Sequence, residues 1–143
     1  MVIGGFWLPC DDGITRPVVI VRVQAINGST LDDRFLIDSG ADRTVLSADF
    51  LGRLGLAVKS EATLAGVGGE QGCVLVNAAL EMTRTDGGIA VVRGDYAAFS
   101  DPTATDLSIL GRDVVSNFDL ILSRRRNEVL LLAPPHSYRV EAN

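Results

Sequence analysis

The sequence predicts an all-β fold with one or two short helices, and three observations support this prediction. Fifteen glycines are spread through short apolar runs, a pattern typical of strands joined by turns. Several of these runs are rich in β-branched residues, which favour strands. Only two short stretches have the features of a helix. Because a length of 143 residues suits one domain, we expect a single domain over residues 1–143.

The first part of the chain predicts two strands and then a short helix. Residues 17–26 form a run rich in β-branched residues, and Asn27-Gly28 supplies the turn chemistry of a hairpin. A second strand over residues 34–37 follows. A short helix comes next, because Ser47 can cap its start and Gly55 can end it.

A glycine cluster lies between two apolar runs in the middle of the chain. It reads Gly66-Val67-Gly68-Gly69, and the runs beside it contain residues 63–64 and 73–76. Glycine adopts several backbone conformations at low cost, so the cluster predicts two strands with a pliable tip. Taken alone, this pattern is that of an ordinary hairpin turn.

The second half of the chain predicts further strands and a second helix near residues 112–117. A closing hairpin carries the basic tip Arg124-Arg125-Arg126, which we expect to be a solvated turn. Pro134-Pro135 then interrupts regular pairing. The core is therefore expected to span about residues 14–133, with a loose tail over 134–143. The predicted strands cover residues 78–83, 89–93, 96–99, 107–111, 118–122 and 128–132.

Composition and charge exclude several classes of function. The net charge of -5 argues against a nucleic-acid binder, which needs a basic field. No apolar run reaches the roughly 20 residues of a membrane span, and the opening lacks the basic start of a signal peptide. We therefore expect a cytoplasmic protein with Cys10 and Cys73 as free thiols. His136 is the single histidine, so we expect no metal site and no cofactor.

The most informative segment is Phe35-Leu36-Ile37-Asp38-Ser39-Gly40. Three apolar residues of a buried strand end in a carboxylate, a hydroxyl and a glycine. A carboxylate at the end of a buried strand is costly unless it has a partner or a function, and Gly40 lets the backbone turn sharply after it. The alternative is an Asx-type turn, in which Asp38 only accepts hydrogen bonds from the following amides.

With three other features, this segment resembles the retroviral-type aspartic proteases, the retropepsins. The family pattern is an apolar run with Asp-Thr/Ser-Gly-Ala, then a glycine-rich flap, and later an apolar pair followed by glycine. Here these features are residues 35–41, residues 66–69 and Ile109-Leu110-Gly111, and Arg16-Pro17 precedes the first long strand. The interval from Asp38 to Gly111 is near what the family needs. The resemblance covers about residues 16–122.

The chain departs from the family pattern in three places, and one of them is the stretch between the flap and Ile109, which does not align residue by residue. Ser39 replaces the commoner threonine and keeps its hydroxyl. A hairpin over residues 118–132 stands where viral members have one short terminal strand. We therefore expect the dimer interface to be the part of this chain that differs most from the viral proteins.

The resemblance implies a retropepsin-like closed β-barrel lobe with a flap hairpin and Asp38 as the catalytic residue. Aspartic hydrolysis needs two carboxylates around one water, whereas the chain has one Asp-Ser/Thr-Gly triplet. The expected active form is a two-fold homodimer in which Asp38 meets its symmetry mate. The expected function is that of an aspartic endopeptidase acting on a peptide or protein. The alternative is a binding or scaffolding domain that keeps the fold without cleaving.

The resemblance also implies roles for the residues around Asp38. Ser39 would hydrogen-bond across the dimer, and Gly40 would leave room for the water and the substrate. The flap over residues 66–69, with Val67 foremost, would close over an extended peptide and pair with its backbone. The other residues expected at the substrate site are Ala41, Asp42, Leu107 and Ile109.

Asp42 lies four residues beyond Asp38, and a second carboxylate there opposes ionisation unless a cation neutralises it. The resemblance assigns this task to Arg112 of the same subunit, which follows Gly111, and to Arg16 of the other subunit. Guanidinium suits both contacts, because it stays charged and can hold a carboxylate with two parallel hydrogen bonds. The alternative is that both arginines are surface residues whose ion pairs contribute about 0–1 kcal/mol.

Overall fold

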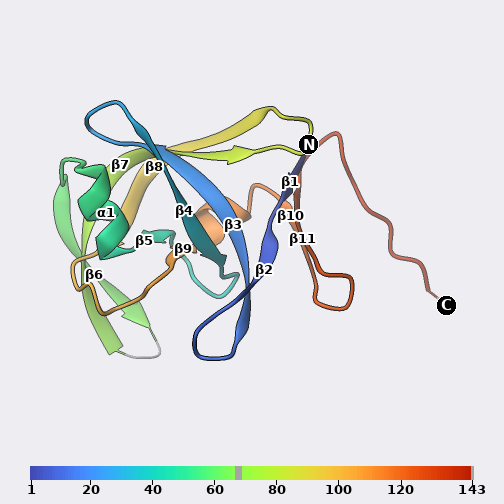
Figure 1. Cartoon of the computed structure of the whole chain (residues 1–143), viewed down its shortest axis with the longest axis horizontal. Coiled ribbons are helices and arrows are strands. Elements are labelled where there is room, and N and C mark those ends of the chain that lie inside the picture. Colours follow the sequence, from blue (N-terminus) through green and yellow to red (C-terminus); the bar gives the residue numbers. More distant parts are fainter. Residues whose placement is uncertain (67–68, 143) are drawn as a thin grey trace.

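The strands of the chain form two sheets, in a computed structural model that describes residues 1–66 and 69–142 (Figure 1). The larger sheet has the order β2-β3-β4-β9-β5-β8-β7-β6, and the smaller has the order β1-β11-β10. The all-β prediction is therefore confirmed. The strands are β1 Val2–Gly4, β2 Phe6–Pro9, β3 Thr15–Gln24, β4 Thr30–Ile37, β5 Val45–Leu46, β6 Ser60–Gly66, β7 Gly69–Thr83, β8 Ile89–Phe99, β9 Ser108–Leu110, β10 Asp119–Ser123 and β11 Glu128–Leu132. The helices are α1 Ala48–Leu54 and α2 Arg112–Val115.

The larger sheet curls round until β3 meets β7. Strand β3 pairs with β4 along its length and also with β7 at Arg22 and Glu81, so six strands form a ring with the core inside. Alternate residues of β3 are buried or exposed, as expected for a strand with one face on a core. Phe35 of β4 meets Phe50 of α1 edge to face, with ring centroids 6.0 Å apart.

The local signals for the first turn and helix are confirmed. Gly28 has a positive φ of 86° in the turn between β3 and β4, a conformation that glycine adopts without strain. The Ser47 hydroxyl accepts a hydrogen bond from the amide of Phe50 at 3.1 Å and so caps α1. Gly55 ends that helix in the left-handed region at φ 65°, which is the usual backbone for a glycine after a helix.

The strands predicted separately over 89–93 and 96–99 are one continuous strand, β8. It pairs without a break with β7, from Cys73 and Phe99 to Thr83 and Ile89. Gly94, which divides the two predicted strands, lies inside this ladder opposite Ala78. The prediction of a break was wrong because a glycine can occupy a strand interior when both neighbours pair.

Strands β1 and β2 were not predicted from the sequence. Strand β1 pairs antiparallel with β11 near the other end of the chain, and β2 pairs with β3. Gly5 joins the two new strands at a crowded place. A Cβ there would lie 2.3 Å from the Val18 carbonyl oxygen and 2.8 Å from a methyl carbon of Val129, so only glycine fits between β3 and β11.

Strand β9 lies between β4 and β5, and this arrangement positions the candidate site. It runs parallel to β4, with Ile37 opposite Leu110, and antiparallel to β5, with Val45 opposite Ile109. The chain therefore leaves β4, passes over the end of β9 through residues 38–44, and returns on its other side. Asp38, which follows β4, and Gly111, which follows β9, are therefore brought to the same end of the sheet.

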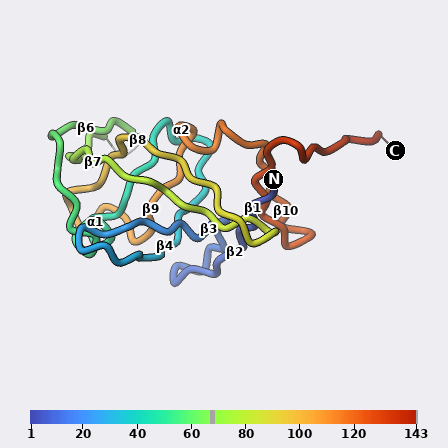
Figure 2. The backbone as a smooth tube through the Cα atoms, turned by 90° about the horizontal axis from the view of Figure 1, so that it is seen from above, coloured from blue at the N-terminus to red at the C-terminus, as the bar shows by residue number. Residues whose placement is uncertain are grey.

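The smaller sheet lies at one end of the molecule, and α1 and β6 lie at the other (Figures 1 and 2). The predicted closing hairpin is confirmed as β10 and β11. Residues 134–142 are exposed and contain no helix or strand, and they extend away from the smaller sheet (Figure 2). Cys10 and Cys73 are free thiols, as expected. In the described part of the chain, no helix is long and apolar enough to cross a membrane.

Candidate active site

Asp38 directly follows β4 and lies half-buried at the end of the barrel. Its amide donates a hydrogen bond to the Leu110 carbonyl oxygen at 3.1 Å, which holds the residue against β9. Its carboxylate oxygen Oδ1 accepts a hydrogen bond from the Gly40 amide at 2.9 Å. Ser39 and Gly40 are both exposed. The carboxylate is thus oriented by its own turn and remains partly exposed to solvent.

Gly111, the residue after β9, packs closely against the backbone of the 38–44 segment that carries Asp38. It is buried, and a Cβ at this position would lie 2.4 Å from the carbonyl carbon of Arg43. Its amide donates to the hydroxyl of Thr44 at 3.0 Å. The following amide, of Arg112, donates to the Ala41 carbonyl oxygen at 2.8 Å. The two segments are therefore joined by hydrogen bonds at both ends of the 41–44 stretch, to a backbone carbonyl at Ala41 and to a side-chain hydroxyl at Thr44.

Thr44 and Asp113 lock the same two segments together and were missed by sequence reasoning. Asp113 accepts a hydrogen bond from the Thr44 hydroxyl at 2.6 Å and bonds from its amide at 2.9 and 3.0 Å. Thr44 is fully buried, so its polar atoms need these partners. The available signal was the position of Asp113 in the first turn of α2, but nothing in the sequence indicates that its partner is Thr44.

Arg112 makes the contact with Asp42 that the resemblance implies. One guanidinium nitrogen donates to the Asp42 carboxylate, and the other donates to the Ser39 carbonyl oxygen at 3.1 Å. The side chains of Arg112 and Asp42 are 51% and 80% exposed. Because both are solvated within one chain, the contact falls in the class of surface ion pairs. The larger effect expected for a buried pair does not apply to the single chain.

Arg112→Ala should therefore lower the free energy of unfolding of the single chain by only about 0–1 kcal/mol. Urea unfolding at low protein concentration, at two salt concentrations, measures this effect. The control is Arg93→Ala, which removes an exposed arginine that makes no ion pair among the described residues. A loss larger than about 2 kcal/mol for Arg112→Ala alone would contradict the surface assignment.

Arg16 binds Asp12 of its own chain rather than standing free. Its two terminal nitrogens donate to the two carboxylate oxygens of Asp12 at 2.9 and 2.6 Å. This pair raises the pKa of Arg16 and, with a bond from the Ile14 amide, lowers the pKa of Asp12 to about 2. Sequence reasoning missed Asp12. The contact of Arg16 with Asp42 of a second subunit stays a prediction.

Gly66 and Gly69, two residues of the glycine cluster, are the last residue of β6 and the first residue of β7, and they pair with each other. The pairing of these strands runs from Ser60 and Leu75 to Gly66 and Gly69, which confirms two strands beside the cluster. Gly69 has φ 102°, a backbone conformation that other residues rarely adopt. Val67 and Gly68, the remaining flap residues of the sequence analysis, lie outside the described residues.

A groove of about 850 Å³ runs along β4 to Leu36, two residues before Asp38. Leu107 and Arg16 line it, together with Asp32 and Asp33. Ile109 does not line this groove. It is partly buried against a small apolar cluster that contains Val45, Cys73 and Ala97. In the described part of the chain, no three His, Cys, Asp or Glu side chains are grouped so as to hold a metal ion.

Asp33 differs from the adjacent Asp32 because the pKa of Asp33 is raised. Burial raises the pKa of this carboxyl above its ordinary value, and a hydrogen bond from Ser108 offsets part of the increase. Arg53 lowers and Asp49 raises the same pKa through weaker charge interactions. Asp32 behaves in the opposite way, since its hydrogen bond from Arg22 lowers the pKa.

Asp33→Asn should raise the free energy of unfolding at neutral pH, and the gain should disappear as the pH falls. A carboxyl whose pKa is raised by folding stabilises the protein only while it is protonated, so the wild type loses stability as the pH rises through the folded pKa. An amide does not titrate. Urea unfolding between about pH 3 and 7 measures the free energy of unfolding of the wild type and of Asp33→Asn.

The control for this experiment is Asp32→Asn, for which the pH dependence should be reversed. The lowered pKa of Asp32 contributes stability above the unfolded pKa, and this contribution is lost as the pH falls through the folded pKa. Asp32→Asn should therefore be less stable than the wild type at neutral pH only. A difference between wild type and Asp33→Asn that stays constant across the range would contradict the assignment.

Comparison with known proteins places this geometry in context. A family model described as aspartyl protease matches residues 21–114. No curated protein sequence matches the chain. A retropepsin-like aspartic protease from Rickettsia conorii has a TM-score of 0.52 at 16% identity, covering 92% of this chain and 97% of that one. This match shows a common fold.

Two further solved structures have TM-scores of 0.49. EIAV protease complexed with the inhibitor HBY-793 is 24% identical, with 71% of this chain and 86% of that chain covered. The retroviral protease-like domain of Ddi1 from Leishmania major is 15% identical, with 82% of this chain and 96% of that chain covered.

Proposed function

Because this chain belongs to the aspartyl protease family and has a retropepsin-like fold, we propose that it is an aspartic endopeptidase whose active site forms between two copies. The observation that carries the proposal is the position of Asp38. Its half-buried carboxylate directly follows β4, is oriented by the Gly40 amide and stays open to solvent. The chain has no second Asp-Ser/Thr-Gly triplet, so the other carboxylate comes from the symmetry mate.

In this proposal the two Asp38 carboxyl groups share one proton and bind one water. The ionised carboxylate removes a proton from the water, which attacks the scissile carbonyl carbon. The protonated carboxyl donates to the carbonyl oxygen as the tetrahedral intermediate forms. The existing hydrogen bond from the Gly40 amide keeps one oxygen of each carboxylate fixed, so the other is free to face the water.

The neighbouring residues complete the proposed site. The exposed Ser39 hydroxyl bonds across the two-fold axis, and Gly40 leaves space for the water. The β6–β7 hairpin closes over an extended peptide, whose side chains meet Leu107 in the groove and Ile109 nearby. Ala41 and Asp42 border the peptide backbone, and Gly111 and Arg112 support their segment. We retain the contact of Arg16 with Asp42 of the second subunit as part of this proposal.

Specific activity should fall when the protein is diluted, because dissociation of the dimer separates the two carboxylates. Cleavage of a peptide library at about pH 4–7, alongside sedimentation over the same protein concentrations, measures both quantities. Statine-like or hydroxyethylene peptide mimics should block the activity. A monomeric sample whose specific activity is independent of concentration would contradict the shared site.

A further inference from the structure

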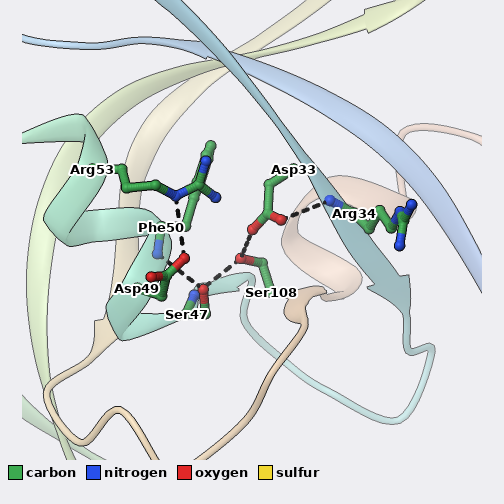
Figure 3. Close-up of polar contacts among 7 residues, drawn as sticks. All are labelled: Asp33, Arg34, Ser47, Asp49, Phe50, Arg53 and Ser108. Carbon is green, nitrogen blue, oxygen red and sulfur yellow. Dashed lines mark hydrogen bonds and ion pairs between the residues drawn. The ribbon is translucent and has the colours of Figure 1, made fainter. Parts of the chain in front are cut away.

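The groove along β4 contains two adjacent carboxylates with different surroundings. Asp32 is exposed and pairs with Arg22 across the β3–β4 hairpin. Asp33 is half-buried and makes no ion pair among the described residues. Its Oδ2 accepts a hydrogen bond from the Ser108 hydroxyl at 2.9 Å, and its Oδ1 accepts one from the Arg34 amide at 2.9 Å (Figure 3). Removing a carboxylate even partly from water without a paired cation costs free energy. The hydrogen bond with Ser108 offsets part of this cost.

Ser108 is fully buried, and its hydrogen bonds have a fixed direction. Its oxygen accepts a hydrogen bond from the Ser47 amide at 3.0 Å (Figure 3). A hydroxyl has one hydrogen to donate, and Asp33 is the acceptor that receives it. Without Asp33, the buried Ser108 hydroxyl would have no acceptor. An unsatisfied buried donor costs more free energy than the removal of both partners of the bond.

The Asp33–Ser108 bond belongs to a chain of hydrogen bonds that joins three elements. From Asp33 in β4 it passes to Ser108 in β9 and to the Ser47 amide, and the Ser47 hydroxyl caps α1 through the amide of Phe50 (Figure 3). The elements on either side of β9 are thereby tied to it by side chains as well as by backbone pairing.

Ser108 is the first residue of β9, and Leu107 is the last residue of the connection that leads into it. Leu107 lines the groove, as does Asp33. Leu107 is held on one side by the Thr105 hydroxyl, which donates to its carbonyl oxygen and accepts from its amide. On the other side it is held by the start of β9, which the Ser108 hydroxyl ties to its two partners. We propose that Asp33 is a positioning residue for substrate binding, which holds Leu107 in the groove through Ser108.

This role rests on the proposed endopeptidase function and concerns binding rather than chemistry. Among the described residues Asp33 makes no hydrogen bond with Asp38, so loss of Asp33 should weaken binding of the substrate and of the transition state equally. Such a change raises KM and leaves kcat nearly unchanged. Loss of one hydrogen bond to a charged acceptor predicts an increase in KM of about tenfold.

The test measures KM and kcat of the full chain with a peptide that the wild type cleaves from a library. Asp33→Ala and Ser108→Ala should each raise KM about tenfold, and the double variant should be no worse than either single one, because both remove the same bond. Asp33→Asn keeps an acceptor oxygen and should restore most of the wild-type KM. Asp95→Asn, which changes an exposed carboxylate of β8 that does not line the groove, should leave KM unchanged.

Amide hydrogen exchange of Ser47 supplies a readout independent of cleavage. Protection of this amide should fall in Asp33→Ala and in Ser108→Ala, and should persist in Asp95→Asn. An unchanged KM in Asp33→Ala, additive effects in the double variant, or a fall in kcat at constant KM would overturn the positioning role while the protease function stands. A dimeric wild type that cleaves no peptide would overturn the proposed function and this role together.

Discussion

We expect Asp38→Asn to abolish peptide cleavage while leaving the fold intact. An amide can neither remove a proton from the water nor donate one as an acid, and loss of acid–base chemistry costs about 10²–10⁴-fold in rate. The asparagine oxygen can still accept the hydrogen bond that the Gly40 amide makes to Asp38 at 2.9 Å, so the turn should keep its shape. Peptide cleavage and urea unfolding of the same samples measure the two effects.

The control for this variant is Asp95→Asn, which changes an exposed carboxylate in β8 that pairs with Lys59. It should cleave like the wild type. If Asp38→Asn cleaves normally, the carboxylate is not catalytic. If the wild type cleaves no peptide while its dimer is intact, the chain is better explained as a binding or scaffolding domain that keeps the family fold.

Features that depend on a few neighbouring residues could be predicted from the sequence. The caps of α1 are examples, because Ser47 needs only an amide three residues ahead and Gly55 needs only a positive φ. The Asp38-Ser39-Gly40 turn is another, since the apolar run before it identifies a buried strand and Gly40 permits the turn. These signals located the ends of the helix and the Asp38 turn. The fold class came from the glycines and the β-branched runs, and Asp38 became the centre of the candidate site through the resemblance to the retropepsins.

Contacts between distant segments could not be predicted in the same way. Thr44 bonds Asp113, and the chain has 18 acidic residues that could have filled that role. Only the placement of β9 between β4 and β5 brings the two together. The β1–β11 pairing likewise joins the two ends of the chain, and a three-residue strand has too short a pattern to reveal its partner.

Arg16 shows how a family resemblance can miss a local partner. The resemblance pairs it with Asp42 of a second subunit, whereas within the chain it holds Asp12, four residues earlier. That spacing is visible in the sequence. It becomes a contact because the chain turns between β2 and β3, with the Gly13 amide donating to the Cys10 carbonyl oxygen. The contact proposed between Arg16 and Asp42 of the second subunit would have to share or break the Arg16–Asp12 pair.

Gly111→Ala should destabilise the protein by about 3 kcal/mol or more, the upper range for forcing extra atoms into a packed site. The new Cβ would lie 2.4 and 2.5 Å from the carbonyl carbon and oxygen of Arg43 and 2.9 Å from the Thr44 amide nitrogen. These are backbone atoms, so no side-chain rotation relieves the contact. The backbone of Gly111 is itself extended, with φ -92°, so the cost is steric rather than conformational. Urea unfolding measures it.

Gly52→Ala is the matched control, because the same methyl group there meets nothing within 4 Å. Gly52 lies inside α1, where alanine is favoured over glycine by about 1 kcal/mol, so this variant should be slightly more stable than the wild type.

Gly111→Ala should also lose activity at temperatures where it remains folded. The 41–44 segment is held at Ala41 by the Arg112 amide and at Thr44 by the Gly111 amide, and moving it displaces the turn that carries Asp38. A Gly111→Ala chain as stable as the wild type would mean that the two segments can separate without cost, and the support assigned to Gly111 would then be wrong.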